Sequence, residues 1–349
     1  MILAEHLINW YKINGRNLPW RHTTNPYIIW LSEIILQQTR VEQGLPYFNK
    51  FVEEYPTVKA FAEAEEDVLL RLWQGLGYYS RVRNMHKAAK MVMSNFNGIF
   101  PTQYEDVIQL TGVGEYTAAA ISSFSINERR AVLDGNVFRV LSRFFGIDTP
   151  INSTAGKKEF LNIANELISD AHPGLYNQAI MDFGATVCKP KGPDCENCVL
   201  RVECVAYHKE IINQLPVKNK GKSSRDRYFN YFVIESNGSV LLSKRGAGDV
   251  WANMYEFPLI ETPREVTVAE LQDDALYKSN FEGVVVEQMG EPIKHVLSHQ
   301  NIYARFYRVI EGQENIKKNP SWNYYFSDNL DKLAKHKLIF SFINKYFMY

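Results

Sequence analysis

Leu110-Thr-Gly-Val-Gly-Glu-Tyr-Thr-Ala-Ala-Ala-Ile121 is the most informative stretch of this sequence, and Ala131-Val-Leu-Asp-Gly-Asn136 follows it closely. Gly112 and Gly114 flank Val113, and glycine accepts the positive φ and the close backbone approach that a tight turn requires. The alanine-rich run after the glycines predicts a helix that begins near Glu115. Before them, Thr102-Gln-Tyr-Glu105 predicts a capping box that opens a short helix. The sequence therefore predicts two helices joined by a glycine hairpin.

A glycine hairpin that leads into a helix N-terminus presents several backbone N–H donors to one anion, and a phosphate of a DNA backbone fits them. An ordinary corner between two helices is the alternative, and Gly-Val-Gly alone favours it. Asp134 changes this balance because it is the only acid in Ala131-Val-Leu-Asp-Gly-Asn-Val-Phe138. A carboxylate in so apolar a run costs free energy unless it is paired or used in chemistry.

A second acid lies in an apolar helix nearer the N-terminus. The loop Arg16-Asn-Leu-Pro-Trp-Arg21 carries two cations and an aromatic, which alone indicate a surface turn, and Asn25-Pro26 then predicts a capped helix start. The predicted helix, residues 27–39, has Glu33 as its only charge. A paired core acid is the usual explanation. Burial would also raise the pKa of Glu33, as a general acid working near neutral pH requires.

All four cysteines lie in Cys188-x6-Cys195-x2-Cys198-x5-Cys204. Clustered thiols in a chain of this size indicate a metal or cluster site rather than a disulfide framework. Structural zinc usually takes two short Cys-x-x-Cys pairs, whereas a [4Fe–4S] cluster accepts looser spacing. The spacing favours the cluster and leaves zinc open.

Composition sets broad limits. A length of 349 residues suits two domains, and 46% apolar residues are ample for a core. No apolar run approaches the length of a membrane span, and the N-terminus lacks the pattern of a signal peptide, so we expect a cytoplasmic protein without membrane contact. The net charge is zero, so any affinity for nucleic acid must come from local placement of cations.

The second half of the chain changes character. Residues 209–227 are basic and lose the helical pattern, which indicates a linker. Beyond it, residues 228–235 and 239–244 predict strands around the turn at Asn237-Gly238.

In the first half, residues 73–87 combine tyrosines with arginines, a lysine and a histidine. Such a segment suits stacking on DNA and phosphate contact, although a solvated helix face is the alternative.

These motifs together resemble the endonuclease III superfamily of DNA glycosylases, and within it the MutY family, which removes adenine opposite 8-oxoguanine. The resemblance is dense from Asn9 to Cys204 and looser from Tyr228 onward. It implies an α + α/β multidomain chain. An all-α helix-hairpin-helix glycosylase domain with a [4Fe–4S] cluster loop spans residues 1–208, a linker 209–227, and a Nudix-like α/β domain for 8-oxoguanine recognition 228–349. The acidic Nudix box is missing from residues 262–282, so we expect no Nudix hydrolase activity.

The resemblance also assigns residues. It places catalysis on Glu33, Asp134, Tyr116 and Asn136. It places adenine binding on Gln178, Arg21, Leu36 and Trp30. It places DNA contact on Arg16, Gln38, Thr39, Tyr78, Arg81, Gly112, Val113 and Gly114. It places the cluster on Cys188, Cys195, Cys198 and Cys204. The amide of Gln178 offers both a donor and an acceptor, the pair that reads one edge of adenine.

One predicted recognition loop departs from the family pattern. MutY proteins carry Phe-Ser-His in a loop that probes 8-oxoguanine, and here the corresponding residues are Leu297, Ser298 and His299. Ser and His can hydrogen-bond a purine edge, but Leu cannot stack on it. The departure leaves the discrimination of 8-oxoguanine from guanine open.

The expected reaction is hydrolysis of the N-glycosidic bond of a flipped adenine. Protonated Glu33 would donate to adenine N7, and ionised Asp134 would stabilise the oxocarbenium ion electrostatically or trap it covalently. Bifunctional relatives carry Lys at the position of Tyr116, so we expect a monofunctional enzyme. Its partner would be double-stranded DNA with 8-oxoguanine:A or G:A mispairs, bound by a monomer in the cytoplasm at a bacterial nucleoid. The alternatives are a thymine or oxidised-pyrimidine glycosylase of the same superfamily and a non-catalytic iron–sulfur DNA-binding module.

Overall fold

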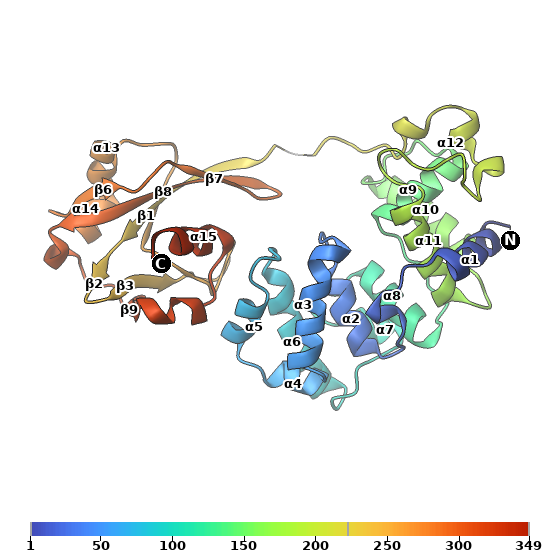
Figure 1. Cartoon of the computed structure of the whole chain (residues 1–349), viewed down its shortest axis with the longest axis horizontal. Coiled ribbons are helices and arrows are strands. Elements are labelled where there is room, and N and C mark those ends of the chain that lie inside the picture. Colours follow the sequence, from blue (N-terminus) through green and yellow to red (C-terminus); the bar gives the residue numbers. More distant parts are fainter. Residues whose placement is uncertain (1, 222, 348–349) are drawn as a thin grey trace. The chain divides into compact units, whose positions relative to one another are not determined.

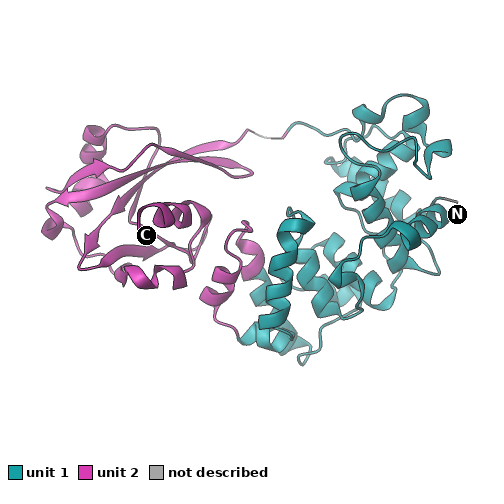
Figure 2. Cartoon of the chain, viewed as in Figure 1, with its two compact units in different colours: residues 1–63, 84–220 teal, residues 64–83, 221–349 magenta. Residues whose placement is uncertain are grey.

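The computed structural model describes residues 2–221 and 223–347 and contains two compact units. Unit 1 comprises residues 1–63 and 84–220, and unit 2 comprises residues 64–83 and 221–349 (Figure 2). The short segment 64–83 thus groups with the C-terminal part of the chain. The predicted domain boundaries at residues 208 and 228 remain predictions.

The described part of unit 1 is built from helices joined by short loops (Figure 1). They are α1 (Ile2–Asn14), α2 (Pro26–Ile35), α3 (Val41–Glu54), α4 (Val58–Glu63), α6 (Ser80–Asn95, whose first turn belongs to unit 2), α7 (Tyr104–Val107), α8 (Glu115–Ile126), α9 (Gly135–Phe145), α10 (Thr154–Leu167), α11 (Pro173–Thr186) and α12 (Val205–His208). Helix α11 contacts α1, α8 and α9 and buries Ala179, Ile180 and Phe183 among them. Burial of each large apolar side chain stabilises this core by roughly 1.5–3 kcal/mol.

Local signals explain where the helices of the site begin. Asn25 caps α2 by accepting a 3.0 Å hydrogen bond from Tyr27 N, and Pro26 occupies the first helical position, as predicted. Helix α8 begins at Glu115, directly after the glycine hairpin, also as predicted. Gly112 has φ +79°, a conformation that a side chain would strain.

Two predictions about helix ends are wrong. Helix α7 begins at Tyr104 with Gln103 as its N-cap and without a side-chain capping bond, so Thr102 and Glu105 form no capping box. Glu105 accepts from Arg130 instead. Helix α2 ends at Ile35 rather than Thr39, and Gln38 has φ +55° in the turn that follows. The C-cap is Leu36, whose φ of −81° and ψ of −5° are still in the right-handed helical region, and the polar residues Gln37, Gln38 and Thr39 follow it.

Unit 2 contains α5 (Glu66–Leu72) and two sheets (Figure 1). The first sheet has the order β5 (Leu259–Thr262), β1 (Arg225–Val233), β8 (Gln300–Glu311) and β6 (Val285–Gln288), with β7 (Ile293–Val296) also paired to β8. Strands β1 and β8 are parallel, and the other pairs are antiparallel. The second sheet joins β3 (Ser239–Lys244) to β2 (Glu235–Ser236), β4 (Tyr255–Glu256) and β9 (Trp322–Phe326).

Helices cover both faces of the first sheet. Neighbouring residues of a strand point to opposite faces, and in β8 Tyr307 packs in the cluster of Phe232 and Phe281, whereas Phe306 stacks on Phe342 at 3.7 Å between ring centroids. Phe281 belongs to α14 (Ala275–Phe281), which follows α13 (Val268–Asp273), and Phe342 to α15 (Lys337–Tyr346). This layered arrangement is the predicted α/β class.

The predicted hairpin at Asn237-Gly238 is present, since both residues have positive φ between β2 and β3. The predicted strand 228–235 is divided, however, because β1 ends at Val233 in the first sheet and β2 begins at Glu235 in the second. Within the described residues, no helix is both long and apolar enough to cross a membrane.

Candidate active site

Glu33 lies on α2 and is 7% exposed. The phenol of Tyr116, from α8, donates a 2.7 Å hydrogen bond to Glu33 Oε2. Burial raises the pKa of Glu33 above its ordinary value, while the Tyr116 hydrogen bond and the charge of Arg21 act in the opposite direction. Burial is the largest effect, and a raised pKa is what a general acid working near neutral pH requires.

Asp134 is the N-cap of α9. Its Oδ1 accepts 2.8 Å hydrogen bonds from the backbone N–H groups of Asn136 and Val137, and Asn136 Nδ2 donates to Oδ2 at 2.8 Å. Burial raises the pKa of Asp134, and these three donors oppose the rise. Because N–H donors favour the charged form, Asp134 is the acid of the two that is built to be an anion.

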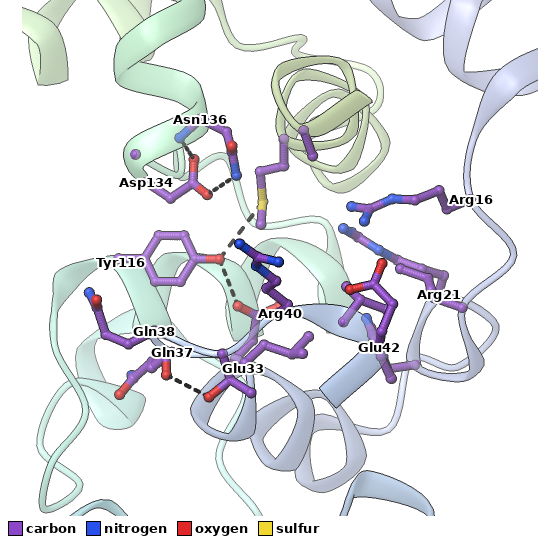
Figure 3. A pocket seen from close by; sticks show the side chains of 18 of the residues that line it. Arg16, Arg21, Glu33, Gln37, Gln38, Arg40, Glu42, Tyr116, Asp134 and Asn136 are labelled. Atoms are coloured by element: carbon purple, nitrogen blue, oxygen red, sulfur yellow. Dashed lines mark hydrogen bonds between the residues drawn. The ribbon is translucent and has the colours of Figure 1, made fainter. Parts of the chain in front are cut away.

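Both acids open into one pocket of about 590 Å³, within the usual range for a small-molecule site. Figure 3 shows Tyr116 between the two carboxyls and Arg16 and Arg21 on another side of the pocket. The lining residues are Arg16, Leu18, Trp20, Arg21, Glu33, Leu36, Gln37, Gln38, Thr39, Arg40, Val41, Glu42, Tyr116, Asp134, Gly135, Asn136, Arg139, Met181, Ala185 and Pro190.

The pocket thus gathers many predicted residues, but not all of them. Trp30 is 1% exposed and packs on Tyr27, Phe61 and Phe100 in the aromatic core, so its assignment to adenine binding is wrong. Gln178 does not line the pocket, and its Oε1 accepts a 3.2 Å hydrogen bond from Tyr11.

Sequence reasoning also missed some lining residues. They are Trp20, Arg40, Glu42 and Met181. Trp20 could have been found, because it lies between the two arginines of the loop before α2. Met181 could not, because a Met in an apolar helix reads as core.

A chain of hydrogen bonds joins the Asp134 loop to the first cysteine. Arg139 Nη2 donates to Asn136 Oδ1 at 2.8 Å and to Gly184 O at 2.7 Å, while its Nε donates to Cys188 O at 2.7 Å. The same guanidinium therefore orients the amide that contacts Asp134 and fixes the start of the cysteine loop.

The four cysteines follow α11, and all of them are partly buried free thiols. Burial raises the pKa of Cys198 to about 11, and the charges of Cys188, Cys204 and Cys195 add to the rise, so the four sulfurs are within electrostatic reach. Among the described residues, no three His, Cys, Asp or Glu side chains could hold one metal ion. Four thiols are a donor set that can hold either a structural zinc ion or a [4Fe–4S] cluster.

Tyr78, Arg81 and the loop 297–299 belong to unit 2. A second pocket, of about 440 Å³, is lined there by Tyr78, Leu297, Ser298, His299 and Trp251 among others. The Tyr78 hydroxyl contacts Ser298 Oγ.

Arg81, by contrast, lies inside the fold. Its Cζ is 4.9 Å from the ring centroid of Trp73 and 5.6 Å from that of Tyr78, and burial lowers its pKa to about 10. Its contact with DNA stays a prediction, and within the unit the guanidinium packs on the segment that carries Tyr78.

Comparisons with known proteins show which families the chain matches. Residues 31–168 match the family described as HhH-GPD superfamily base excision DNA repair protein, and residues 230–345 match the NUDIX domain. The adenine DNA glycosylase of Buchnera aphidicola subsp. Baizongia pistaciae (strain Bp) is 32% identical over 94% of this chain and 92% of its own length. That of Buchnera aphidicola subsp. Acyrthosiphon pisum (strain APS) is 36% identical over 76% of this chain and 77% of its own.

Among solved structures, a thermostable thymine-DNA glycosylase aligns with a TM-score of 0.56 and 27% identity, covering 60% of this chain and 96% of its own. Fold, pocket and comparisons define a DNA glycosylase of the HhH-GPD superfamily with a Nudix-like unit. The chain belongs to the adenine DNA glycosylase (MutY) family.

Proposed function

We propose that this enzyme flips adenine out of double-stranded DNA, where it is mispaired with 8-oxoguanine or guanine, and hydrolyses its N-glycosidic bond to leave an abasic site. The main support for the proposal is that one pocket holds two buried carboxyls with different hydrogen-bond donors. Glu33 is buried with a phenol as its partner, and Asp134 accepts three N–H hydrogen bonds.

These environments divide the chemistry. Glu33, protonated, donates to N7 of the flipped adenine, so the base leaves as a neutral molecule rather than as a poor anion. Asp134, ionised, stabilises the positive charge that develops on the sugar, by electrostatics or by a short-lived covalent bond. Asn136 and Tyr116 orient the two acids through the hydrogen bonds described above.

The reaction is expected to stop at the abasic site. A lyase step needs an amine that forms a Schiff base with the sugar. Tyr116 lines the pocket at the position where bifunctional relatives carry Lys, and its hydroxyl is bound to Glu33. A phenol cannot form that imine, so the enzyme is monofunctional.

The adenine pocket and the DNA contacts draw on residues around these acids. Arg21 and Leu36, which line the pocket, contact the base, while Arg16, Gln38 and Thr39, which also line it, contact DNA. The hairpin Gly112-Val113-Gly114 offers backbone N–H groups to a phosphate. Gln178 contacts adenine only if it exchanges its bond from Tyr11 for one to the base.

The unit 2 pocket is proposed to recognise 8-oxoguanine. Tyr78 is 48% exposed and is available to intercalate beside the lesion, and Ser298 and His299 hydrogen-bond its edge. Leu297 fills space there without stacking. A [4Fe–4S] cluster on Cys188, Cys195, Cys198 and Cys204 would anchor the loop that Arg139 ties to Asn136.

The test is excision on four matched duplexes, 8-oxoG:A, G:A, G:T and 8-oxoG:C, each analysed with and without alkali. The proposal predicts strand cleavage at A opposite 8-oxoG, and more weakly opposite G, only after alkali. Cleavage without alkali would contradict monofunctional action. Cleavage of G:T would instead support the thymine glycosylase alternative, and binding without excision would support a non-catalytic module.

A further inference from the structure

Asp182, on α11, is a buried carboxylate next to the adenine pocket that the mechanism above does not use. It is fully buried. Its Oδ2 accepts the backbone N–H of Arg16 at 2.9 Å, and its Oδ1 accepts from Arg16 Nε at 3.1 Å and from Arg16 Nη2 at 2.7 Å. Arg21 Nη2 lies 3.9 Å from the same Oδ1. One carboxylate thus faces both arginines of the loop before α2, and both arginines line the pocket.

The guanidinium of Arg21 carries N–H donors that the described residues leave without an acceptor. Its side chain is 8% exposed, and its guanidinium lies over the ring of Phe124 at 5.4 Å from the centroid. Its Nε and Nη1 are buried without a hydrogen-bond partner in the described part of the chain. Buried N–H donors without acceptors cost free energy. A ligand with acceptor atoms, such as a purine base in the pocket, would satisfy them.

Arg21 also acts on the catalytic acid, because its charge lowers the pKa of Glu33 against the larger effect of burial. A cation without a counter-charge in a buried pocket would favour ionised Glu33 and so remove the proton that the reaction needs. The other charged or titratable groups that face the pocket are Tyr116 from α8, Asp134 at the start of α9, Arg139 from α9, Arg16, Arg40 and Glu42.

We propose that Asp182 is a positioning residue of the adenine pocket: its carboxylate holds Arg16 and Arg21 at the pocket and balances their charge beside Glu33. Asp182 itself touches neither the base nor the sugar. This inference rests on the proposed adenine excision, because Asp182 would act through Glu33, the acid that protonates adenine in that reaction.

The experiment is single-turnover excision of adenine opposite 8-oxoguanine by the full-length protein, measured across pH. Asp182→Asn keeps the shape of the side chain and removes its charge, and Arg21→Gln removes the cation. Arg16→Lys keeps the charge and loses the two-pronged contact with Asp182. Tyr176→Phe is the matched control on α11, because it removes a buried hydroxyl that has no hydrogen-bond partner within the described residues and leaves every charge in place.

The account predicts two shifts of opposite sign. Glu33 works protonated, so excision falls as pH rises through the pKa of Glu33. Asp182→Asn should move that fall to lower pH and slow excision roughly 10- to 100-fold, because the arginines lose their anchor. Arg21→Gln should move the fall to higher pH. Arg16→Lys should slow excision with its pH midpoint unchanged, and Tyr176→Phe should match the parent in both.

The outcomes distinguish a failure of the positioning role of Asp182 from a failure of the proposed adenine excision. A parent protein that does not excise adenine at all would refute the proposed function. An active parent whose Asp182→Asn variant keeps the parental rate and pH midpoint would refute the positioning role alone. Shifts of the same sign in Asp182→Asn and Arg21→Gln would also refute it. If Asp182→Asn does not fold, an unshifted midpoint in Arg21→Gln refutes the charge balance, and an unchanged rate in Arg16→Lys refutes the anchoring.

Discussion

The hydroxyl of Tyr116 donates a 2.7 Å hydrogen bond to Oε2 of Glu33, so a buried phenol is the direct partner of the proposed general acid. The hydrogen bond and the burial of Glu33 act on its pKa in opposite directions. A donor on the carboxylate favours its ionised form, whereas burial favours the protonated form. Burial is the larger effect, so the pKa of Glu33 lies above its ordinary value while the hydrogen bond fixes the orientation of the carboxyl.

Tyr116→Phe should therefore separate orientation from proton affinity. Loss of the hydrogen bond leaves the pKa of Glu33 higher, so the fall of excision with rising pH should move to higher pH. The rate below that fall should drop roughly tenfold, because the carboxyl is no longer held toward the base. A single-turnover pH profile of the variant measures both quantities. A midpoint that moves to lower pH would contradict this reading of the bond.

Glu33→Gln should bind substrate and fail to excise it. The amide has nearly the same shape and can still accept from Tyr116 through its carbonyl, but it has no acidic proton to give. We expect a loss of roughly 100- to 10,000-fold in the rate of excision, the usual contribution of a general acid. Affinity for 8-oxoG:A duplex, measured by fluorescence anisotropy, should stay near that of the parent. Parental turnover by Glu33→Gln would show that another group protonates the base.

Asp134→Asn offers a test in which structure and charge are separable. Asn is as good an N-cap as Asp, so α9 should keep its start and the melting temperature should change little. The negative charge that stabilises the sugar cation is lost, and excision should slow by roughly 100- to 1,000-fold. Thermal unfolding beside the excision rate checks this. A large drop in melting temperature with the excision rate of the remaining folded protein unchanged would assign Asp134 a capping role only.

The ionisation of Asp134 also predicts that activity falls on the acid side of the pH profile. It works ionised, so excision should fall as pH drops through the pKa of Asp134, which burial places above the ordinary value of an aspartate. The parent enzyme should therefore show a bell-shaped profile with Asp134 on the acid side and Glu33 on the alkaline side. In Asp134→Asn the fall on the acid side should disappear from the residual activity.

The cysteine loop predicts an iron–sulfur protein. The purified chain should contain iron and acid-labile sulfide in equal amounts and absorb broadly in the visible range, without zinc. Cys198→Ser should lose this absorption and lower the melting temperature, because the three remaining thiols then lack their common ligand. Zinc without sulfide in the parent would contradict the assignment of the donor set.

The sequence was informative where one residue type admits few environments. Asp134 in an apolar run and Glu33 in an apolar helix could both be recognised, because a buried acid needs a reason to be there. The glycine hairpin and the cysteine cluster could be recognised as well, because glycines at a turn and clustered thiols also occur in few environments. The hairpin at Asn237-Gly238 followed from its turn signal, whereas the α/β class of the second half followed from the family resemblance.

Other features depend on packing that periodicity does not encode. Trp30 and Trp20 are both tryptophans near Glu33, yet Trp30 lies in the core and Trp20 lines the pocket. Arg81 lies in a segment with the composition of a phosphate contact, and its packing on Trp73 and Tyr78 is visible only in the fold. The partnership of Asp182 with Arg16 spans 166 residues of sequence, so only the fold reveals it.

The most direct test of the central claim, proton donation from Glu33 to adenine N7, uses a substrate without that nitrogen. A duplex with 7-deazaadenine opposite 8-oxoguanine carries a C–H group in place of N7 and keeps the Watson–Crick edge. The account predicts that the enzyme binds this duplex about as well as the natural one and leaves the base in place over the time in which adenine is fully excised. Excision of 7-deazaadenine at a comparable rate would contradict it, because the base would then leave without protonation at N7.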